Sequence, residues 1–276
     1  MLKLLERNIA SVDQRLVLLA PPHASAHAFF RNVEVDPSLH DTLVGEMQRV
    51  RGGIYLEDGA VARHELSKGR HQTPEDQNSW HLLMLDRQKQ VTACVWYMEH
   101  TSSASIDSLR VRSCPLATQD EWRGRFRGAI QAELTRARQL GMRYAEVGGW
   151  AVAPQHRCKS EGLLLALAAY SLGRIAGGAL GLTTATVRHA SSTILRRIGG
   201  SHLMSDSGPV PAYFDSRYNC EMELLRFDSR RPSPKFEALI DGLKDKLAYV
   251  PVISSTPLDA PFEYSEMPAV SASLAA

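Results

Sequence analysis

The chain has 276 residues, 44% of them hydrophobic and 22% charged, which is the composition of an ordinary globular protein with one large or two modest domains. A formal net charge of +2 at pH 7 calls for neither nucleic acid nor an anionic membrane as partner. The cysteines show neither a CxxC pair nor metal-ligand spacing: Cys94, Cys114, Cys158 and Cys220. Together with an N-terminus interrupted by charges, this spacing predicts a reduced, cytoplasmic protein without a metal site.

The N-terminal half is predicted to form an antiparallel meander that follows an extension. Residues 1–35 form the extension, with a short strand at 15–20. Apolar residues at helical spacing predict a helix over 36–50, and Gly52 and Gly53 predict its end. Apolar runs and alternation predict three further strands, at residues 80–85, 91–98 and 106–114.

The C-terminal half alternates between helices and strands. A long amphipathic helix is predicted over 118–140, with Gly141 as its stop. After it the predicted elements are a strand at 143–152, a helix at 163–176, a strand at 182–189, a helix at 191–198, a strand at 218–227 and a helix at 236–247. A β-α-β-α succession after a meander predicts an α/β (α+β) fold, with a mixed, mostly antiparallel sheet and helices on both faces.

These elements divide the chain into one main domain over 36–228, a C-terminal helical segment over 229–252 and a tail over 253–276. The tail is rich in Ser, Pro and Ala without a period, which predicts disorder. The apolar stretch over 162–182 has the length of a membrane span. Arg174 and the glycines that end it favour a buried helix instead, so no membrane is expected.

The polar stretch VAPQHRCKSEG, residues 152–162, joins a predicted strand to this apolar helix. Free backbone N–H groups at a helix N-terminus bind anions, pyrophosphate above all. Arg157 and Lys159 would add charge, while Ser160 and Gly162 would let phosphate oxygens approach the backbone. The alternative is an ordinary strand-to-helix loop with solvated basic residues.

The order V-x-P-x-x-R-x-x-S-x-G resembles the acyl-CoA pyrophosphate motif of the GNAT superfamily of N-acyltransferases, with Arg157, Ser160 and Gly162 on its key positions. The resemblance extends over residues 91–200 and implies the GNAT fold with a β-α-β-α acyl-CoA-binding core. Acetyl-CoA or a longer acyl-CoA would be the co-substrate. The superfamily's usual tyrosine general acid falls at Leu195, so that acid is missing. The donor-binding residues implied are Trp150, Ala151, Val152, Gln155, His156, Arg157, Cys158, Lys159, Ser160 and Gly162.

The meander side resembles one branch of that superfamily, the acyl-homoserine-lactone synthases and the long-chain N-acyl amino acid synthases. Arg51, Tyr55 and Glu146 match the branch's arginine, its aromatic residue four positions later and its strand glutamate. The branch's other arginines fall at Gly149 and near Trp96, and so a lactone synthase that uses S-adenosylmethionine is not expected.

Glu146 is the candidate general base, because an amine must lose a proton to attack a thioester. Gly148 and Gly149 beside it predict a strand bulge, and a backbone N–H near Val152 would serve as oxyanion donor. The alternative is a glutamate that faces solvent. Cys158 invites a nucleophile hypothesis, but no positioned His–acid pair supports covalent catalysis.

Arg51 could hold an acceptor carboxylate, with Tyr55 closing the pocket. Equally, Arg51 could cap its helix and Tyr55 could be core. Between Arg110 and Arg143 basic residues outnumber acidic ones, which fits an acyl carrier protein docking face or a solvated helix face. No aromatic interleaving supports nucleic acid.

The sequence therefore predicts an N-acyltransferase that moves an acyl group from acyl-CoA or acyl carrier protein to a primary amine by direct attack, without a metal. Two alternatives stay open. One is a long-chain N-acyl amino acid or lactone-like signal synthase. The other is a catalytically silent acyl-CoA-binding regulatory module, which the missing tyrosine and arginines motivate.

Overall fold

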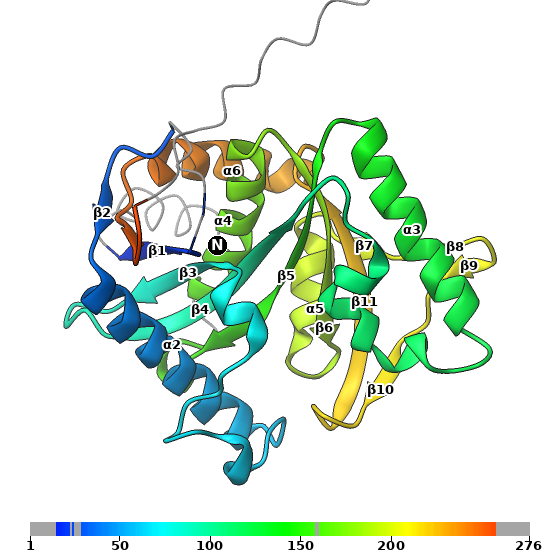
Figure 1. Cartoon of the computed structure of the whole chain (residues 1–276), viewed down its shortest axis with the longest axis horizontal. Helices are drawn as coiled ribbons and strands as arrows, with labels where there is room; N and C mark the ends of the chain where they lie inside the picture. The colour runs from blue at the N-terminus through cyan, green and yellow to red at the C-terminus, as the bar shows by residue number, and fades with distance from the viewer. Residues whose placement is uncertain (1–14, 23, 25–28, 158–159, 258–276) are drawn as a thin grey trace, which may run out of the picture.

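A computed structural model describes residues 15–22, 24, 29–157 and 160–257. One large sheet has the strand order β10-β11-β6-β5-β4-β3-β1-β12-β2, with β7 paired to β11 (Figure 1). Its strands are β1 (Leu16–Ala20), β2 (Val33–Val35), β3 (Trp80–Leu85), β4 (Val91–His100), β5 (Arg143–Val152), β6 (Ala179–Thr186), β7 (Ser201–His202), β10 (Tyr213–Asp215), β11 (Cys220–Asp228) and β12 (Val252–Ser254). A small hairpin pairs β8 (Met204–Ser205) with β9 (Gly208–Pro209). The pairs β5–β6, β1–β12 and β12–β2 are parallel and the others antiparallel, which confirms the predicted mixed, mostly antiparallel sheet.

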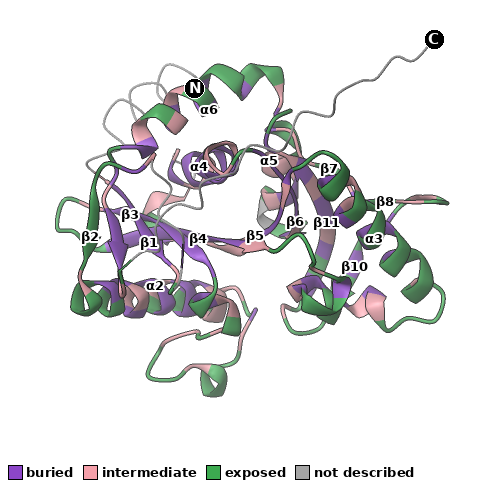
Figure 2. Ribbon diagram, turned by 45° about the horizontal axis from the view of Figure 1, so that its top comes forward, coloured by how far each residue is buried: buried purple, intermediate pink, exposed green. Residues whose placement is uncertain are grey.

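Helices cover both faces of the sheet, as predicted (Figure 2). The helices are α2 (Pro37–Glu57), α3 (Arg123–Gln139), α4 (Glu161–Ile175), α5 (Ser191–Arg197) and α6 (Pro234–Leu247). The largest apolar cluster joins α4 and α6 to one face of the sheet. On the other face a cluster under α2 and a second cluster under α3 are separate. α4 is apolar nearly all round because it lies between the sheet and α6.

Within the described part of the chain, no helix has both the length and the apolar content that a membrane crossing requires.

Helix α2 begins as predicted, since the Asp36 side chain accepts a hydrogen bond from the Leu39 N–H and Pro37 takes the first position. It does not end at Gly52 and Gly53, however, and this prediction was wrong. A Cβ at Gly52 would lie 2.6 Å from the carbonyl oxygen of Gly69, so the glycine admits a loop that packs against the helix. Close tertiary approach, and not helix termination, explains this glycine.

The predicted strand over 106–114 is also wrong. This segment forms short 3-10 turns, Ile106–Ser108 and Arg110–Ser113, that pack under α3. Over residues 144–147, β5 already pairs with β4 on one side and with β6 on the other, so this part of the described sheet takes no further strand. The apolar residues of this segment alternate because Ile106, Leu109 and Val111 are buried in the cluster under α3.

Strand β1 lies inside the main sheet, between β3 and β12, and all five of its residues are buried. Leu16–Ala20 therefore contributes to the core, which differs from an extension that lies apart from it. β12 likewise pairs at the start of the predicted tail, and residues 258–276 lie outside the described residues. Both differences have one cause: β1 and β12, from opposite ends of the chain, pair in parallel, and local sequence does not reveal such pairing.

The parallel ladder between β5 and β6 ends at the pair Val147–Thr183, although β6 continues to Thr186 and β5 to Val152. On its other side β5 pairs with β4, with a register shift between Cys94 and Trp96. The predicted bulge is present: Gly149 has a φ of 63°, which glycine adopts without strain. The two strands therefore separate at the point where the candidate site lies.

Candidate active site

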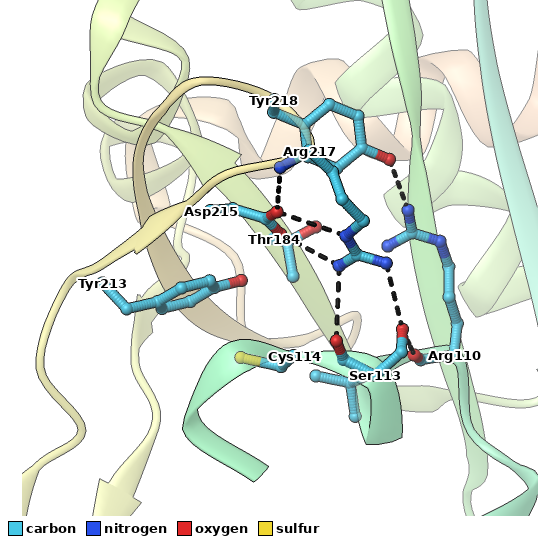
Figure 3. Close-up of a pocket in the computed structure, with 9 residues that line it drawn as sticks. Arg110, Ser113, Cys114, Thr184, Tyr213, Asp215, Arg217 and Tyr218 are labelled. Atoms are coloured by element: carbon cyan, nitrogen blue, oxygen red, sulfur yellow. Dashed lines mark hydrogen bonds and ion pairs between the residues drawn. The ribbon is translucent and has the colours of Figure 1, made fainter. Parts of the chain in front are cut away.

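Two adjoining hollows lie in the protein surface, and Thr184 of β6, one residue past the end of the ladder with β5, lines both. One, of about 210 Å³ including its open mouth, is drawn in Figure 3. The other, of about 190 Å³ including the open solvent at its mouth, is lined by Glu146 and Val147 of β5, by residues of β6, and by Trp96. Arg110, Val111 and Thr184 line both hollows.

Glu146 lies in a polar enclosure with only 4% of its surface exposed. Its Oε2 accepts hydrogen bonds from the Arg110 N–H at 2.7 Å and from His100 Nε2 at 2.9 Å, and its Oε1 accepts the Val111 N–H at 2.8 Å. The glutamate does not face bulk solvent. A carboxylate offers about four acceptor positions, so three donors leave one, on Oε1, for a further N–H.

His100 was not among the predicted site residues. It lies on β4 opposite Tyr144 of β5, and only this antiparallel register brings it to Glu146. No sequence signal marks that register.

Arg51 is a buried ion-pair partner, 1% exposed. Its Nη2 donates to Asp76 Oδ2 at 2.7 Å and to the His71 carbonyl at 2.5 Å. Burial alone would raise the pKa of Asp76, but the hydrogen bond and charge of Arg51 bring that pKa below its usual value. Nε and Nη1 of Arg51 have no hydrogen-bond partner among the described residues. Arg51 is not among the residues that line either hollow.

Tyr55 lies between His71, whose carbonyl binds Arg51, and Tyr218, which lines the hollow of Figure 3. Its ring centroid is 5.3 Å from that of His71 and 6.1 Å from that of Tyr218, which lines the hollow. Burial raises the pKa of the Tyr55 hydroxyl well above its ordinary value. Tyr55 is therefore a neutral side chain that supports one wall.

Arg110 and Arg217 point into the hollow of Figure 3 from different elements. Arg110 Nη2 donates to Tyr218 Oη at 2.7 Å, and its Nε is 3.3 Å from Glu75 Oε1. Arg217 Nη2 is 2.9 Å from Asp215 Oδ2. Sequence reasoning placed Arg110 on a basic surface and missed Asp215, Arg217 and Tyr218, because only the fold brings the end of β10 and the β10–β11 connection to this turn.

The loop from β5 to α4 contains a 3-10 turn, Pro154–His156, and then Arg157. Arg157 Nη2 lies 3.5 Å from Asp58 Oδ1 and 3.7 Å from Glu57 Oε2, both at the C-terminal end of α2. Glu161, in the first turn of α4, lies 3.2 Å from Arg15 and 3.4 Å from His156. An anion that binds at this loop would compete with these carboxylates for the same positively charged side chains.

Other predicted donor-binding residues surround this loop. Gly162 lets the chain pack closely, since a Cβ there would lie 3.1 Å from the Trp150 ring and 3.2 Å from Val152. Gln155 is exposed, Ala151 is buried towards α2, and Ser160 precedes α4. Cys158 and Lys159 lie outside the described residues.

The predicted basic face is partly neutralised within the protein. Arg143 lies 3.5 Å from Glu99, and Arg110 points into the hollow. On α3, Arg127 lies 3.1 Å from Asp107. Among the described residues, no three His, Cys, Asp or Glu side chains gather as metal ligands, and Cys94, Cys114 and Cys220 are buried free thiols.

The strand order, the separation of β5 and β6 and the helix after that separation define the GNAT fold that the sequence resemblance implied. No protein-family model matches the chain, and no curated protein matches it in sequence. Among solved structures, it is similar to a CoA-dependent acyl-homoserine lactone synthase, BjaI, with SAM and isopentyl-CoA, at a TM-score of 0.52 and 16% identity, over 88% of this chain and 94% of that one. The same synthase with MTA gives a TM-score of 0.51 at 17% identity over the same shares. This likeness confirms the fold of the predicted branch.

Proposed function

We propose that this protein is an N-acyltransferase that moves an acyl group from acyl-CoA to a primary amine by direct attack. The observation that carries the proposal is the end of the β5–β6 ladder at Val147 and Thr183. Beyond it, residues 148–152 of β5 have no strand neighbour on the β6 side within the described part of the chain. Backbone groups on such an edge can hydrogen-bond an extended ligand as a further strand would. The amide groups of pantetheine suit that role.

The start of α4 supports the same donor. β5 leads through one short loop into a helix of 15 residues whose body is buried, so its N-terminal N–H groups are held rigidly beside the open strand edge. Arg157 and His156 lie on this loop. A CoA pyrophosphate would replace Glu57 and Asp58 as the partner of Arg157. The attraction between Arg157 and these two carboxylates is weak, because solvent partly screens the side chains. The solved synthase of the same fold holds isopentyl-CoA, which is consistent with this donor.

The hollow beside Glu146 suits the acceptor amine. An amine N–H would donate to the remaining acceptor position of Oε1, and the carboxylate would take the proton as the nitrogen attacks the thioester carbon. The backbone N–H near Val152 would stabilise the oxyanion, and the CoA thiolate would leave. No enzyme-bound acyl group is formed in this sequence.

Calorimetry and native mass spectrometry test the donor site. CoA, acetyl-CoA and a long-chain acyl-CoA are each titrated into the wild type, into Arg157→Ala and into Arg127→Ala. Arg127 is a matched control, because it is also a half-exposed arginine paired with a carboxylate, but it lies on α3. We expect affinity to fall about tenfold in Arg157→Ala, equivalent to about 1.4 kcal/mol, and to stay unchanged in the control. Absence of binding to every thioester by the wild type would refute the proposal.

A further inference from the structure

Trp96 occupies a gap between the two apolar clusters of the α2–α3 face and belongs to neither. It lies on β4 opposite Gly148 of β5, and 5% of its surface is exposed. A Cβ added at Gly148 would lie 2.4 Å from the indole ring, and one at Gly149 would lie 2.3 Å from it. The ring therefore covers the backbone of the two glycines in direct contact. Only glycine at these positions lets it do so.

The same ring is close to two polar regions. It lines the hollow that holds Glu146, and the Arg110 guanidinium carbon lies 5.9 Å from its centroid. Arg51 is also near the ring, because the Cβ position at Gly149 that meets the indole is 3.2 Å from Arg51 Nη1. Arg51 keeps Nε and Nη1 without a hydrogen-bond partner among the described residues, while Asp76 holds its other end. The indole thus lines the hollow beside the base and covers glycines that lie close to a buried cation, two of whose nitrogen atoms have no hydrogen-bond partner among the described residues.

We propose that Trp96 determines acceptor specificity: its indole limits the acceptor to a small amine and keeps Arg51 from binding an acceptor carboxylate. This inference rests on the proposed acyltransferase function. Carboxylates pair best with a guanidinium that presents two N–H groups side by side, and an arginine buried without full hydrogen bonding gains most from such a partner. Removing the indole would extend the hollow towards Arg51 and offer these donors to the acceptor.

The first test uses acceptors in pairs that differ only by an α-carboxylate: ethylamine and alanine, phenethylamine and phenylalanine, tryptamine and tryptophan. Free CoA is measured after reaction with acetyl-CoA or with the acyl-CoA that binds best. We expect the wild type to prefer ethylamine to tryptamine at least tenfold in kcat/KM. In Trp96→Ala that ratio should fall at least tenfold, and each carboxylated amine should gain relative to its partner.

Three variants control this experiment. Trp96→Phe keeps a ring over the glycines and should keep the wild-type order of acceptors. Trp96→Leu replaces Trp96→Ala if the latter does not fold, which its thermal melt reports. Trp122→Ala removes a tryptophan that lines neither hollow and should leave the order unchanged. An unchanged order in Trp96→Ala and Trp96→Leu would overturn the inference.

The second test needs no catalysis. Phenylglyoxal modifies accessible arginines, and peptide mass spectrometry measures the modified fraction of Arg51. We expect little modification of Arg51 in the wild type and in Trp96→Phe, and at least a fivefold increase in Trp96→Ala, whereas exposed Arg87 reacts equally in all three. Equal modification of Arg51 throughout would overturn the shielding role. These outcomes can be told apart from a failure of the proposed acyltransferase function, because in that case the wild type would bind no thioester.

Discussion

His100 Nε2 and Glu146 Oε2 lie 2.9 Å apart on adjacent strands, β4 and β5. The same carboxylate holds the turn at Arg110 and Val111 through two backbone N–H groups. Glu146 therefore fixes the wall of the hollow and faces into it. This double role explains why a charged residue is buried in the middle of a strand: its hydrogen bonds replace the water that burial removes.

Replacing Glu146 by Gln should reduce acyl transfer by about 10²–10⁴-fold, the usual contribution of a general base. Acyl-CoA binding, measured by calorimetry, should change little, because the hydrogen bonds of Glu146 go to His100, Arg110 and Val111 and not to the loop around Arg157. Glu99→Gln is the matched control: this residue lies on β4 next to His100, pairs with Arg143 and lines neither hollow. Equal activity of the two variants would remove Glu146 from the chemistry, and loss of thermal stability in Glu146→Gln alone would assign it to structure.

Removing one partner of the buried Arg51–Asp76 pair should destabilise the protein by about 3–5 kcal/mol, because the other charge is then left in the interior. Urea unfolding of Asp76→Ala measures this free energy. The exposed pair of Arg127 and Asp107 provides the comparison, and Asp107→Ala should cost about 0–1 kcal/mol. Similar costs for both variants would contradict the assignment of Arg51 to a structural ion pair.

The free energy of unfolding should decrease as the pH falls from about 6.5 to 4. Burial lowers the pKa of His81 to about 4, below the ordinary value of 6.5, so the folded state holds this histidine neutral. The unfolded state binds the proton first, and stability that is fully present above pH 6.5 is lost on acidification towards the folded pKa. One such group contributes a slope of about 1.4 kcal/mol per pH unit.

Chemical denaturation at pH 7, 6, 5 and 4.5 measures that slope, and His81→Gln tests its source. The variant should show a shallower dependence, by about one proton. His71, whose pKa is also lowered to about 4, would retain its own share. A slope unaffected by His81→Gln would mean that another group titrates.

Gly149→Ala should destabilise the protein by about 1–3 kcal/mol and shift the tryptophan fluorescence. The new methyl group would lie 2.3 Å from the Trp96 ring, and the positive φ of 63° would strain any residue with a Cβ. Gly128→Ala is the control on α3, where nothing lies within 4 Å of the added Cβ, and helix propensity predicts a gain of about 0.5–1 kcal/mol. Opposite signs in thermal melts would support the close contact, and a neutral Gly149→Ala would argue against it.

Local patterns in the sequence determined the elements whose period is distinct. The hairpin of β3 and β4, the strand β5 and the helices α3, α4 and α6 lie within a few residues of their predicted positions, because each buries a face that repeats with the period of its own backbone. The sequence also placed Glu146 on β5 beside a bulge, since two glycines in a strand interrupt the ladder.

Tertiary structure alone decided what those residues contact. Residues 106–114 alternate like a strand, yet they form short 3-10 turns, because residues 144–147 of β5 already pair with β4 and β6. Arg51 carries the right charge for an acceptor carboxylate, yet Asp76 and the Trp96 ring enclose it. His100 and Tyr218 reach the site from distant segments. Periodicity reports which face of an element is buried, but partners are chosen by strand register and by competition for space, and these depend on the whole chain.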